Sequence, residues 1–251
     1  MHYDREKLQW LEFDLFKAYP HVRHAVFQRH GGVSEKGFST LNASDSVGDH
    51  PDAVKVNRAR MKEVLGVEQL VFPHQQHGTN IVRITKKNAT QTHQADALFT
   101  TEKGIGLGVA HADCQGALFF DPKNQVIAAA HVGWRGNVQN LYRVVVEKLK
   151  QEMDSKPENL LVCISPSLGP DHAEFINYKT EFPKEFWTFQ EQERPHFFDL
   201  WALSTSQLAA CGVLEKNIEI ANTCTACSSE DYFSYRKDHK TGRNATVIAL
   251  E

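Results

Sequence analysis

The segment that most clearly indicates the fold spans residues 126–131 and reads Val-Ile-Ala-Ala-Ala-His. A continuous apolar run of this length is typical of a strand that is buried on both faces. Outward from it, apolar runs that predict strands occur at 24–30, 70–72, 81–84, 95–99, 105–110, 117–120, 160–164, 218–221 and 245–250. The middle of the chain is therefore predicted to consist mainly of strands.

Helical patterns separate only some of these strands. Apolar residues recur at roughly helical spacing after Pro51 and stop at Gly66, which predicts a helix with proline in its first turn. Two further helices are predicted at about 138–153 and 200–211. Because helices and strands do not alternate regularly, we predict an α+β fold. It is a single-domain α/β sandwich over residues 1–251, with mixed β-sheets flanked by helices.

The composition is that of an ordinary globular protein, with 41% hydrophobic and 24% charged residues and a net charge of −3. Basic residues are spread along the chain, which argues against a nucleic-acid partner. The apolar runs are too short to span a bilayer, and residues 1–7 lack the apolar core of a secretory signal. Five cysteines form an odd set. We therefore expect a cytoplasmic protein with free thiols and no membrane partner.

Three potential metal ligands lie at or near the ends of predicted strands, where a rigid sheet can present functional groups. They are His77 in Gln-Gln-His-Gly, Cys114 in Ala-Asp-Cys, and His131 at the end of the segment 126–131. Each residue taken alone also has an ordinary structural explanation. Together they would supply three ligands and leave a tetrahedral ion one open position, as in catalytic zinc sites. The sequence therefore predicts a Zn²⁺ site.

Other uses of the same three residues remain open. Two histidines and a cysteine also hold copper in blue-copper proteins, which would give a phenol oxidoreductase. The 13 histidines include no His-x-His pair, so an oxidase with several coppers is disfavoured. Without a metal, Cys114 could be the nucleophile of a hydrolase, with His131 or His77 as its base. A purely structural zinc ion is the last alternative.

A second group of candidate ligands lies later in the chain. His172-Ala-Glu174 and Cys224-Thr-Ala-Cys227 contain the residue types of a zinc nucleobase deaminase. However, Thr223 occupies the place of that motif's proline, and the separation of the two parts is long. We interpret the cysteines as ordinary thiols and residues 172–174 as a surface loop. A redox role is disfavoured because no helix is predicted after the pair to lower the pKa of the first thiol.

A series of motifs along nearly the whole chain resembles one known family. The motifs are Arg29–Ser34, Ser39–Asn42, Val47–Pro51, Gln75–Gly78, Ala112–Cys114, Ala129–Gly136, Phe198–Trp201, Phe233–Arg236 and Thr241–Arg243. In this order they resemble the laccase-domain family. Its members were long labelled multicopper polyphenol oxidases and are recognised as zinc-dependent purine nucleoside phosphorylases that also deaminate adenosine.

The resemblance implies that His77, Cys114 and His131 hold the catalytic zinc ion. It also implies that purine nucleosides and phosphate are the substrates. Adenosine, inosine, guanosine or methylthioadenosine would then react with phosphate to give the free base and ribose 1-phosphate. Adenosine deamination is implied as a side activity.

Four further residues are candidates for the reaction. Arg58 and Arg236 are candidate phosphate ligands, because a guanidinium group binds oxygen pairs in a bidentate way. Both could instead be solvated surface arginines. Ser34 is a candidate nucleoside ligand, although turn formation after two glycines also explains it. Asp113 is a candidate catalytic residue that either orients a ligand imidazole or accepts a proton.

The sequence departs from the family pattern at two places near these candidates. His111 stands where the family usually has threonine, and residues 165–170 lack the cysteine of the family's Gly-Pro-Cys-Ile-Gly-Pro segment. Neither place includes a predicted zinc ligand. We expect both departures to affect the preference for particular nucleosides rather than the binding of the metal.

Overall fold

The computed structural model describes residues 7–251 and confirms an α+β sandwich with mixed sheets in a single domain. Most of the segment in which no secretory signal was expected lies outside the described residues. One sheet has the order β1-β2-β11-β6-β3. Its strands are β1 (Trp10–Leu11), β2 (Val22–Phe27), β11 (Asn244–Leu250), β6 (Ile105–His111) and β3 (Gln69–Val71). Only β3 and β6 pair in parallel in this sheet.

The second sheet has six strands in the order β10-β9-β7-β8-β5-β4. They are β10 (Ile218–Ile220), β9 (Leu161–Ile164), β7 (Gln115–Asp121), β8 (Val126–Val132), β5 (Ala97–Thr100) and β4 (Ile81–Arg83). The outer pairs β10–β9 and β4–β5 are parallel, whereas the central strands are antiparallel. Every strand of both sheets lies near a run that the sequence predicted, except the two-residue β1.

Strand β8 shows why its apolar run is continuous. Successive side chains of a strand point to opposite faces. Ile127 and Ala129 pack between the two sheets, whereas Ala128 and Ala130 pack against the covering helices. Because β8 lies between β7 and β5, its backbone is also paired on both edges. His131 has the same parity as Ile127, so it extends the row of side chains that faces the other sheet.

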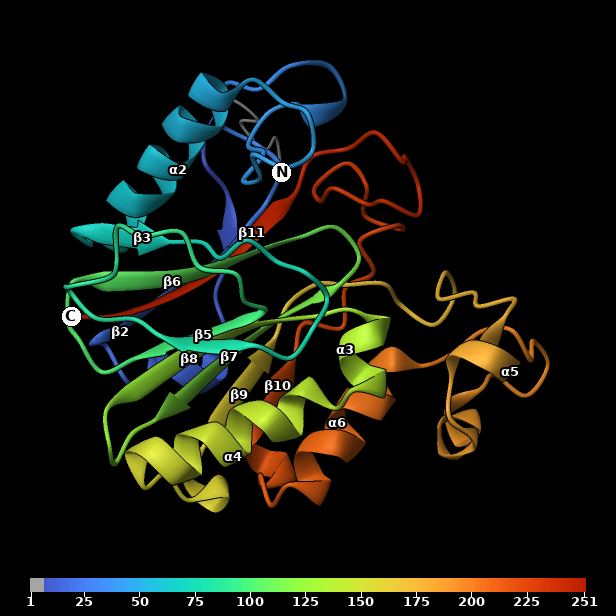
Figure 1. Cartoon of the computed structure of the whole chain (residues 1–251). Coiled ribbons are helices and arrows are strands. Elements are labelled where there is room, and N and C mark those ends of the chain that lie inside the picture. Colours follow the sequence, from blue (N-terminus) through green and yellow to red (C-terminus); the bar gives the residue numbers. More distant parts are fainter. Residues whose placement is uncertain (1–6) are drawn as a thin grey trace.

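Helices cover the outer faces of both sheets, giving four layers (Figure 1). Helix α2 (Pro51–Leu65) packs on the five-stranded sheet, and α4 (Leu141–Met153) and α6 (Leu200–Ala210) pack on the six-stranded sheet. As predicted, α2 begins with proline and is followed by Gly66, which has a left-handed conformation with φ of 64°. None of the helices in residues 7–251 is long and apolar enough to cross a membrane.

The remaining helices are short. They are α1 (Asp14–Lys17), α3 (Trp134–Val138), α5 (Tyr178–Glu181) and the 3₁₀ turns Lys36–Phe38, Pro157–Asn159, Lys184–Phe189 and Glu215–Asn217. The part of the chain around α5 extends beyond the sandwich (Figure 1) and is held by its own aromatic cluster, which includes Phe175, Phe182 and Phe198. This extension forms one wall of the cavity described below.

The predicted helix at 138–153 is wrong at its start. Asn140 has a positive φ of 53°, which breaks the helical path. Its side-chain oxygen accepts a hydrogen bond from the backbone N–H of Arg143, so it caps α4, which begins at Leu141. Residues 134–138 form the separate helix α3, which begins two residues after β8 ends. The chain therefore changes direction twice after His131, at Gly133 between β8 and α3 and at Asn140 between α3 and α4.

Candidate metal centre

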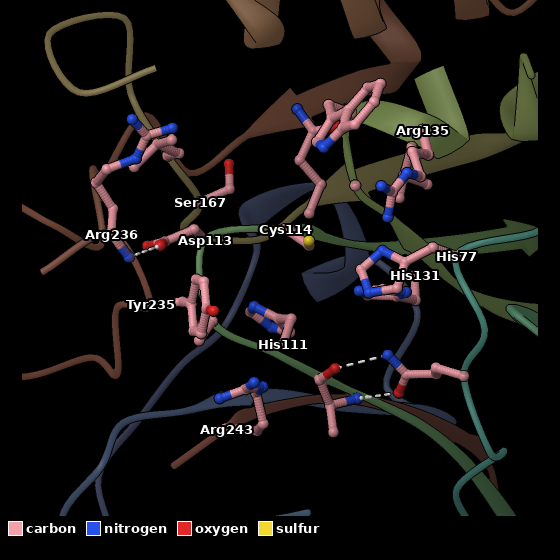
Figure 2. Close-up of a pocket in the computed structure, with 18 of the residues that line it drawn as sticks. His77, His111, Asp113, Cys114, His131, Arg135, Ser167, Tyr235, Arg236 and Arg243 are labelled. Atoms are coloured by element: carbon pink, nitrogen blue, oxygen red, sulfur yellow. Dashed lines mark hydrogen bonds between the residues drawn. The ribbon is translucent and has the colours of Figure 1, made fainter. Parts of the chain in front are cut away.

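A cavity of about 860 Å³ opens where the ends of the strands meet the segment around α5. This volume lies within the range of sites for small molecules and cofactors. Figure 2 shows charged and aromatic side chains reaching into it from several directions. Those labelled are His77, His111, Asp113, Cys114, His131, Arg135, Ser167, Tyr235, Arg236 and Arg243.

The three predicted ligands come together in the wall of this cavity. His77 lies in the loop between β3 and β4, Cys114 follows β6, and His131 lies near the end of β8. One ligand atom from each lies within 4.8 Å of the other two. The imidazole rings of His77 and His131 meet edge to face, with centroids 4.8 Å apart. Figure 2 shows the Cys114 sulfur on the side of the two rings.

Asp96 organises the centre, and the sequence analysis missed it. This buried carboxylate precedes β5 and accepts a hydrogen bond from Nδ1 of His131 at 3.0 Å. It also accepts the backbone N–H groups of Gln76, His77 and Gly78 at 3.1, 2.9 and 2.7 Å. One carboxylate thus fixes the ring of one ligand and the backbone of another. The signal that could have revealed it is an acidic residue inside the apolar run 95–99.

The donor set suits a zinc ion. Asp96 occupies Nδ1 of His131, which leaves Nε2 as the ligand nitrogen, and a carboxylate in this position is common behind zinc-bound histidines. Gly133 leaves room for the cluster: a Cβ atom there would lie 2.8 Å from the Cys114 sulfur and 3.2 Å from Nδ1 of His77. Two neutral imidazoles and a thiolate would leave Zn²⁺ a charge of about +1 and an open position.

The protonation of the two imidazoles differs because their surroundings differ. Burial, together with the nearby His131, lowers the pKa of His77 to about 4, so its ring is neutral and free to donate a lone pair. Burial would also lower the pKa of His131, but the Cys114 thiolate and Asp96 outweigh it and raise that pKa to about 9. A metal ion at this centre therefore has to displace a proton.

Asp113 was expected either to orient a ligand imidazole or to accept a proton, and the structure bears on the first of these roles. Asp96, and not Asp113, holds the ligand imidazole. Asp113 has a positive φ of 80°, and its two carboxylate oxygens accept from the hydroxyl of Thr225 at 2.7 Å and the backbone N–H of Arg236 at 2.6 Å. It therefore ties the Cys114 turn to residues 225–236. Its role as a proton acceptor stays a prediction.

The three candidate substrate residues lie in different places. Arg58 and Arg236 both line the cavity. Arg58 donates to the carbonyl of Ala43 at 2.8 Å, and Arg236 donates to the carbonyl of Glu174 at 2.9 Å. Ser34 is buried, is not among the residues that line the cavity, and donates to Asp49 at 2.6 Å. Its contact with a nucleoside stays a prediction.

Two other residues of the cavity had no assigned role. Arg243 lines it, and burial lowers the pKa of its guanidinium group. His111 is almost fully buried, donates or accepts at 2.6 Å with the hydroxyl of Thr246, and has an Nδ1 without a hydrogen-bond partner among the described residues. Burial, followed by the charges of His131 and Arg243, lowers its pKa to about 3. Both residues belong to motifs that the sequence analysis quoted or discussed.

The structure also brings His172, Cys224 and Cys227 together, with ligand atoms within 4.8 Å of one another. The sequence analysis, which interpreted them as ordinary thiols and a surface loop, did not predict that they lie together. The sequence separation that argued against a cluster is bridged by pairing of Ser167 with Cys224. All five cysteines are free thiols.

Comparisons with known proteins agree with this fold. A family model described as multi-copper polyphenol oxidoreductase laccase matches residues 23–251. The chain is 31% identical to a purine nucleoside phosphorylase of Bacteroides thetaiotaomicron, covering 96% of both chains. It is 32% identical to purine nucleoside phosphorylase YfiH of Escherichia coli, covering 88% of this chain and 91% of that protein.

A solved structure gives the same result in three dimensions. The crystal structure of YlmD from Geobacillus stearothermophilus matches with a TM-score of 0.88 and 28% identity, covering 96% of each chain. The family model and the relatives each account for most of the sequence. The chain therefore belongs to the multi-copper polyphenol oxidoreductase laccase family.

Proposed function

We propose that the protein is a zinc-dependent purine nucleoside phosphorylase with adenosine deaminase side activity. The observation that carries the proposal is the meeting of His77, Cys114 and His131 in the wall of a cavity that arginines also line. Relatives named purine nucleoside phosphorylase, at about 31% identity over most of the chain, support it. The proposed substrates are adenosine, inosine, guanosine or methylthioadenosine together with phosphate.

In phosphorolysis, a phosphate oxygen forms a bond to C1′ of the sugar while the bond from C1′ to the purine nitrogen breaks. The departing base takes the electron pair and then a proton. The protein must therefore bind an anion, and Arg58, Arg236 and Arg243 supply positive charge in the cavity. When bound, zinc supplies a Lewis-acid centre that attracts phosphate oxygens and can acidify water.

The chain's own residues hold this arrangement in place. Asp113 positions Arg236 through its backbone N–H at 2.6 Å, while the guanidinium group of Arg236 reaches the carbonyl of Glu174 at 2.9 Å. Phe175 and Tyr235 line the same cavity and offer aromatic surfaces on which a purine can stack. The proposal thus places the base on the side of Tyr235 and the phosphate between the arginines and the metal centre.

Product analysis tests this function. Purified protein is incubated with adenosine, inosine, guanosine or methylthioadenosine, with and without phosphate, and the products are separated. Release of free base only with phosphate is the expected result, and conversion of adenosine to inosine without phosphate shows the side activity. The proposal would be refuted if none of the four nucleosides released free base with phosphate present. Metal analysis and oxygen uptake with a phenol distinguish zinc from the copper-dependent alternative.

One geometric observation favours a second candidate, a hydrolase with Cys114 as nucleophile. A ring nitrogen of His131 lies within 4.8 Å of the Cys114 sulfur, and Nδ1 of His131 donates to Asp96 at 3.0 Å, which is the order of groups in a Cys–His–Asp relay. His77 has no place in such a relay, yet its ligand atom lies within the same 4.8 Å group. Strong chelation separates the two candidates, because the hydrolase would keep its activity and the zinc enzyme would lose it.

A further inference from the structure

We propose that His172, Cys224 and Cys227 form a second zinc site, separate from the centre at His77, Cys114 and His131. We call these three residues the outer cluster. The proposal concerns binding of a divalent metal ion with a preference for sulfur and nitrogen ligands, and it does not depend on the proposed function.

The distances in the outer cluster suit one ion. Nδ1 of His172 lies 3.4 Å from the Cys227 sulfur and 3.7 Å from the Cys224 sulfur. Tetrahedral zinc, with bonds of about 2.3 Å to sulfur and 2.0 Å to nitrogen, separates two such ligands by about 3.5 Å. A single nitrogen placed at that distance from both sulfurs is what a shared ion requires. A disulfide between the cysteines would not account for the position of the imidazole.

The local chain conformation supports the cluster without help from the main centre. The two cysteines have the Cys-x₂-Cys spacing that is common in zinc sites. The backbone N–H of Thr225 donates to the carbonyl of Ser167 at 3.0 Å, and that of His172 donates to Gly169 at 3.0 Å. A Cβ atom at Gly169 would lie only 2.9 Å from Cβ of Cys224, so glycine permits the close approach of the two segments.

Charge and exposure indicate the chemistry of the site. Two thiolates and one neutral imidazole would exactly balance the charge of Zn²⁺, unlike the main centre, where one positive charge remains. Cys227 is exposed and His172 and Cys224 are partly buried, so solvent can supply the fourth ligand. A neutral site at the surface is suited to holding chain segments together rather than to attracting phosphate.

The segments that the outer cluster would join both reach the cavity. One contains Ser167 and Glu174, and the other leads from the cysteines to Arg236. Thr225, next to Cys224, donates to Asp113 at 2.7 Å. The backbone carbonyl of Glu174, two residues after His172, accepts a hydrogen bond from the guanidinium group of Arg236 at 2.9 Å. A metal ion bound outside the cavity would therefore restrict the backbone that carries Arg236 and supports Asp113.

Metal stoichiometry tests the proposal. The full chain is purified with a reductant, incubated with excess Zn²⁺, freed of unbound metal and analysed for zinc and protein. We expect two zinc ions per chain in the wild type and one in Cys227→Ser, whose exposed position makes the folded state tolerant of the change. Cys211→Ser, a free cysteine outside both clusters, is the matched control and should keep two.

A variant that lacks a ligand of the main centre distinguishes zinc at the outer cluster from zinc at the main centre. Cys114→Ser should also hold one zinc ion, and the double variant Cys114→Ser/Cys227→Ser none. Replacement by Co²⁺ gives a second readout, because Cys227→Ser should lose part of the sulfur-to-cobalt charge-transfer absorption that Cys211→Ser keeps. A wild type that binds no zinc, or a Cys227→Ser variant that binds as many ions as the wild type, overturns the outer site. Loss of both ions from Cys114→Ser alone would also overturn an independent second site.

Discussion

The molecule contains two groups of histidine and cysteine that differ in how the fold supports them. The main centre lies on loops at strand ends, and Asp96 fixes one ligand ring together with the backbone of another. The outer cluster lies on turns near the surface, and its two cysteines are three positions apart. With zinc bound, the main centre would keep a positive charge facing the cavity. The outer cluster is more exposed, and with zinc bound it would be neutral and would join two segments. The same residue types are therefore expected to have a catalytic role at the main centre and a structural role at the outer cluster, because their surroundings differ.

The largest expected effect comes from removing the thiolate of the main centre. Cys114→Ser should lower the rate of phosphorolysis by more than about 100-fold, because loss of a ligand costs more than loss of a supporting hydrogen bond. The protein should stay folded, since the residue lies in the cavity wall rather than in either hydrophobic core. Rates with inosine and phosphate, with circular dichroism as the check of folding, measure this. Cys211→Ser is the control, and near-normal rates in Cys114→Ser would contradict a catalytic centre.

The support of the main centre can be removed without removing a ligand. Asp96→Asn weakens the hydrogen bond to His131 and should lower zinc affinity at this centre by about 10- to 100-fold. Zinc at the outer cluster should be unaffected. Competition with a chelator measures the affinity.

Asp231→Asn is the matched control for Asp96→Asn, because the Asp231 carboxylate also pairs with a histidine, His30 at 3.0 Å, and this histidine belongs to neither cluster. It should leave both affinities unchanged. Equal weakening of the two metal sites by Asp96→Asn would show a general loss of structure instead of a local one.

The three residues of the main centre could be selected from the sequence because Cys114 and His131 stand at or near the ends of apolar runs and His77 lies in the loop after another. Strand β8 could be predicted in the same way, because its burial on both faces accounts for the continuous apolar run from Val126 to Ala130. Asp96 could not be assigned in this way. Its role depends on three N–H groups in a loop about 20 residues earlier in the chain, and no local pattern encodes that approach.

Two other features depended on information that short patterns lack. The break before α4 needs Asn140 in a left-handed conformation, which asparagine tolerates but does not require. The outer cluster was dismissed because its parts lie far apart and lack the motif of known deaminases. Pairing of Ser167 with Cys224 overcomes that separation in the folded chain. Comparison with a known motif finds only sites that share its residue spacing, whereas the fold can bring together residues at other spacings.

The dependence of stability on pH tests the buried surroundings of the main centre, where His111 lines the same cavity. The pKa of His111 falls from an ordinary 6.5 to about 3 in the folded state, mainly because of burial. Between these values the unfolded chain binds a proton that the folded chain excludes. The stability present above pH 6.5 is therefore lost as the pH falls, by up to about 1.4 kcal/mol per pH unit.

His111→Thr should reduce this dependence, and urea unfolding at pH 7, 6 and 5 measures it. The comparison uses the slope against pH, because the smaller side chain also changes the absolute stability. His50→Gln, at an exposed position, serves as the control. An unchanged slope in His111→Thr would show that another group is responsible for the acid sensitivity.

The smallest expected effect concerns the coupling between the two regions. Cys227→Ser should raise KM for phosphate by about threefold and leave kcat nearly unchanged, because the change reaches Arg236 only through the backbone between them. The effect should disappear when the variant is compared with wild type from which the outer zinc ion has been removed. A larger fall in kcat than rise in KM would mean that the outer cluster takes part in the reaction itself. In that case the division between a catalytic and a supporting metal site, on which the comparison depends, would be wrong.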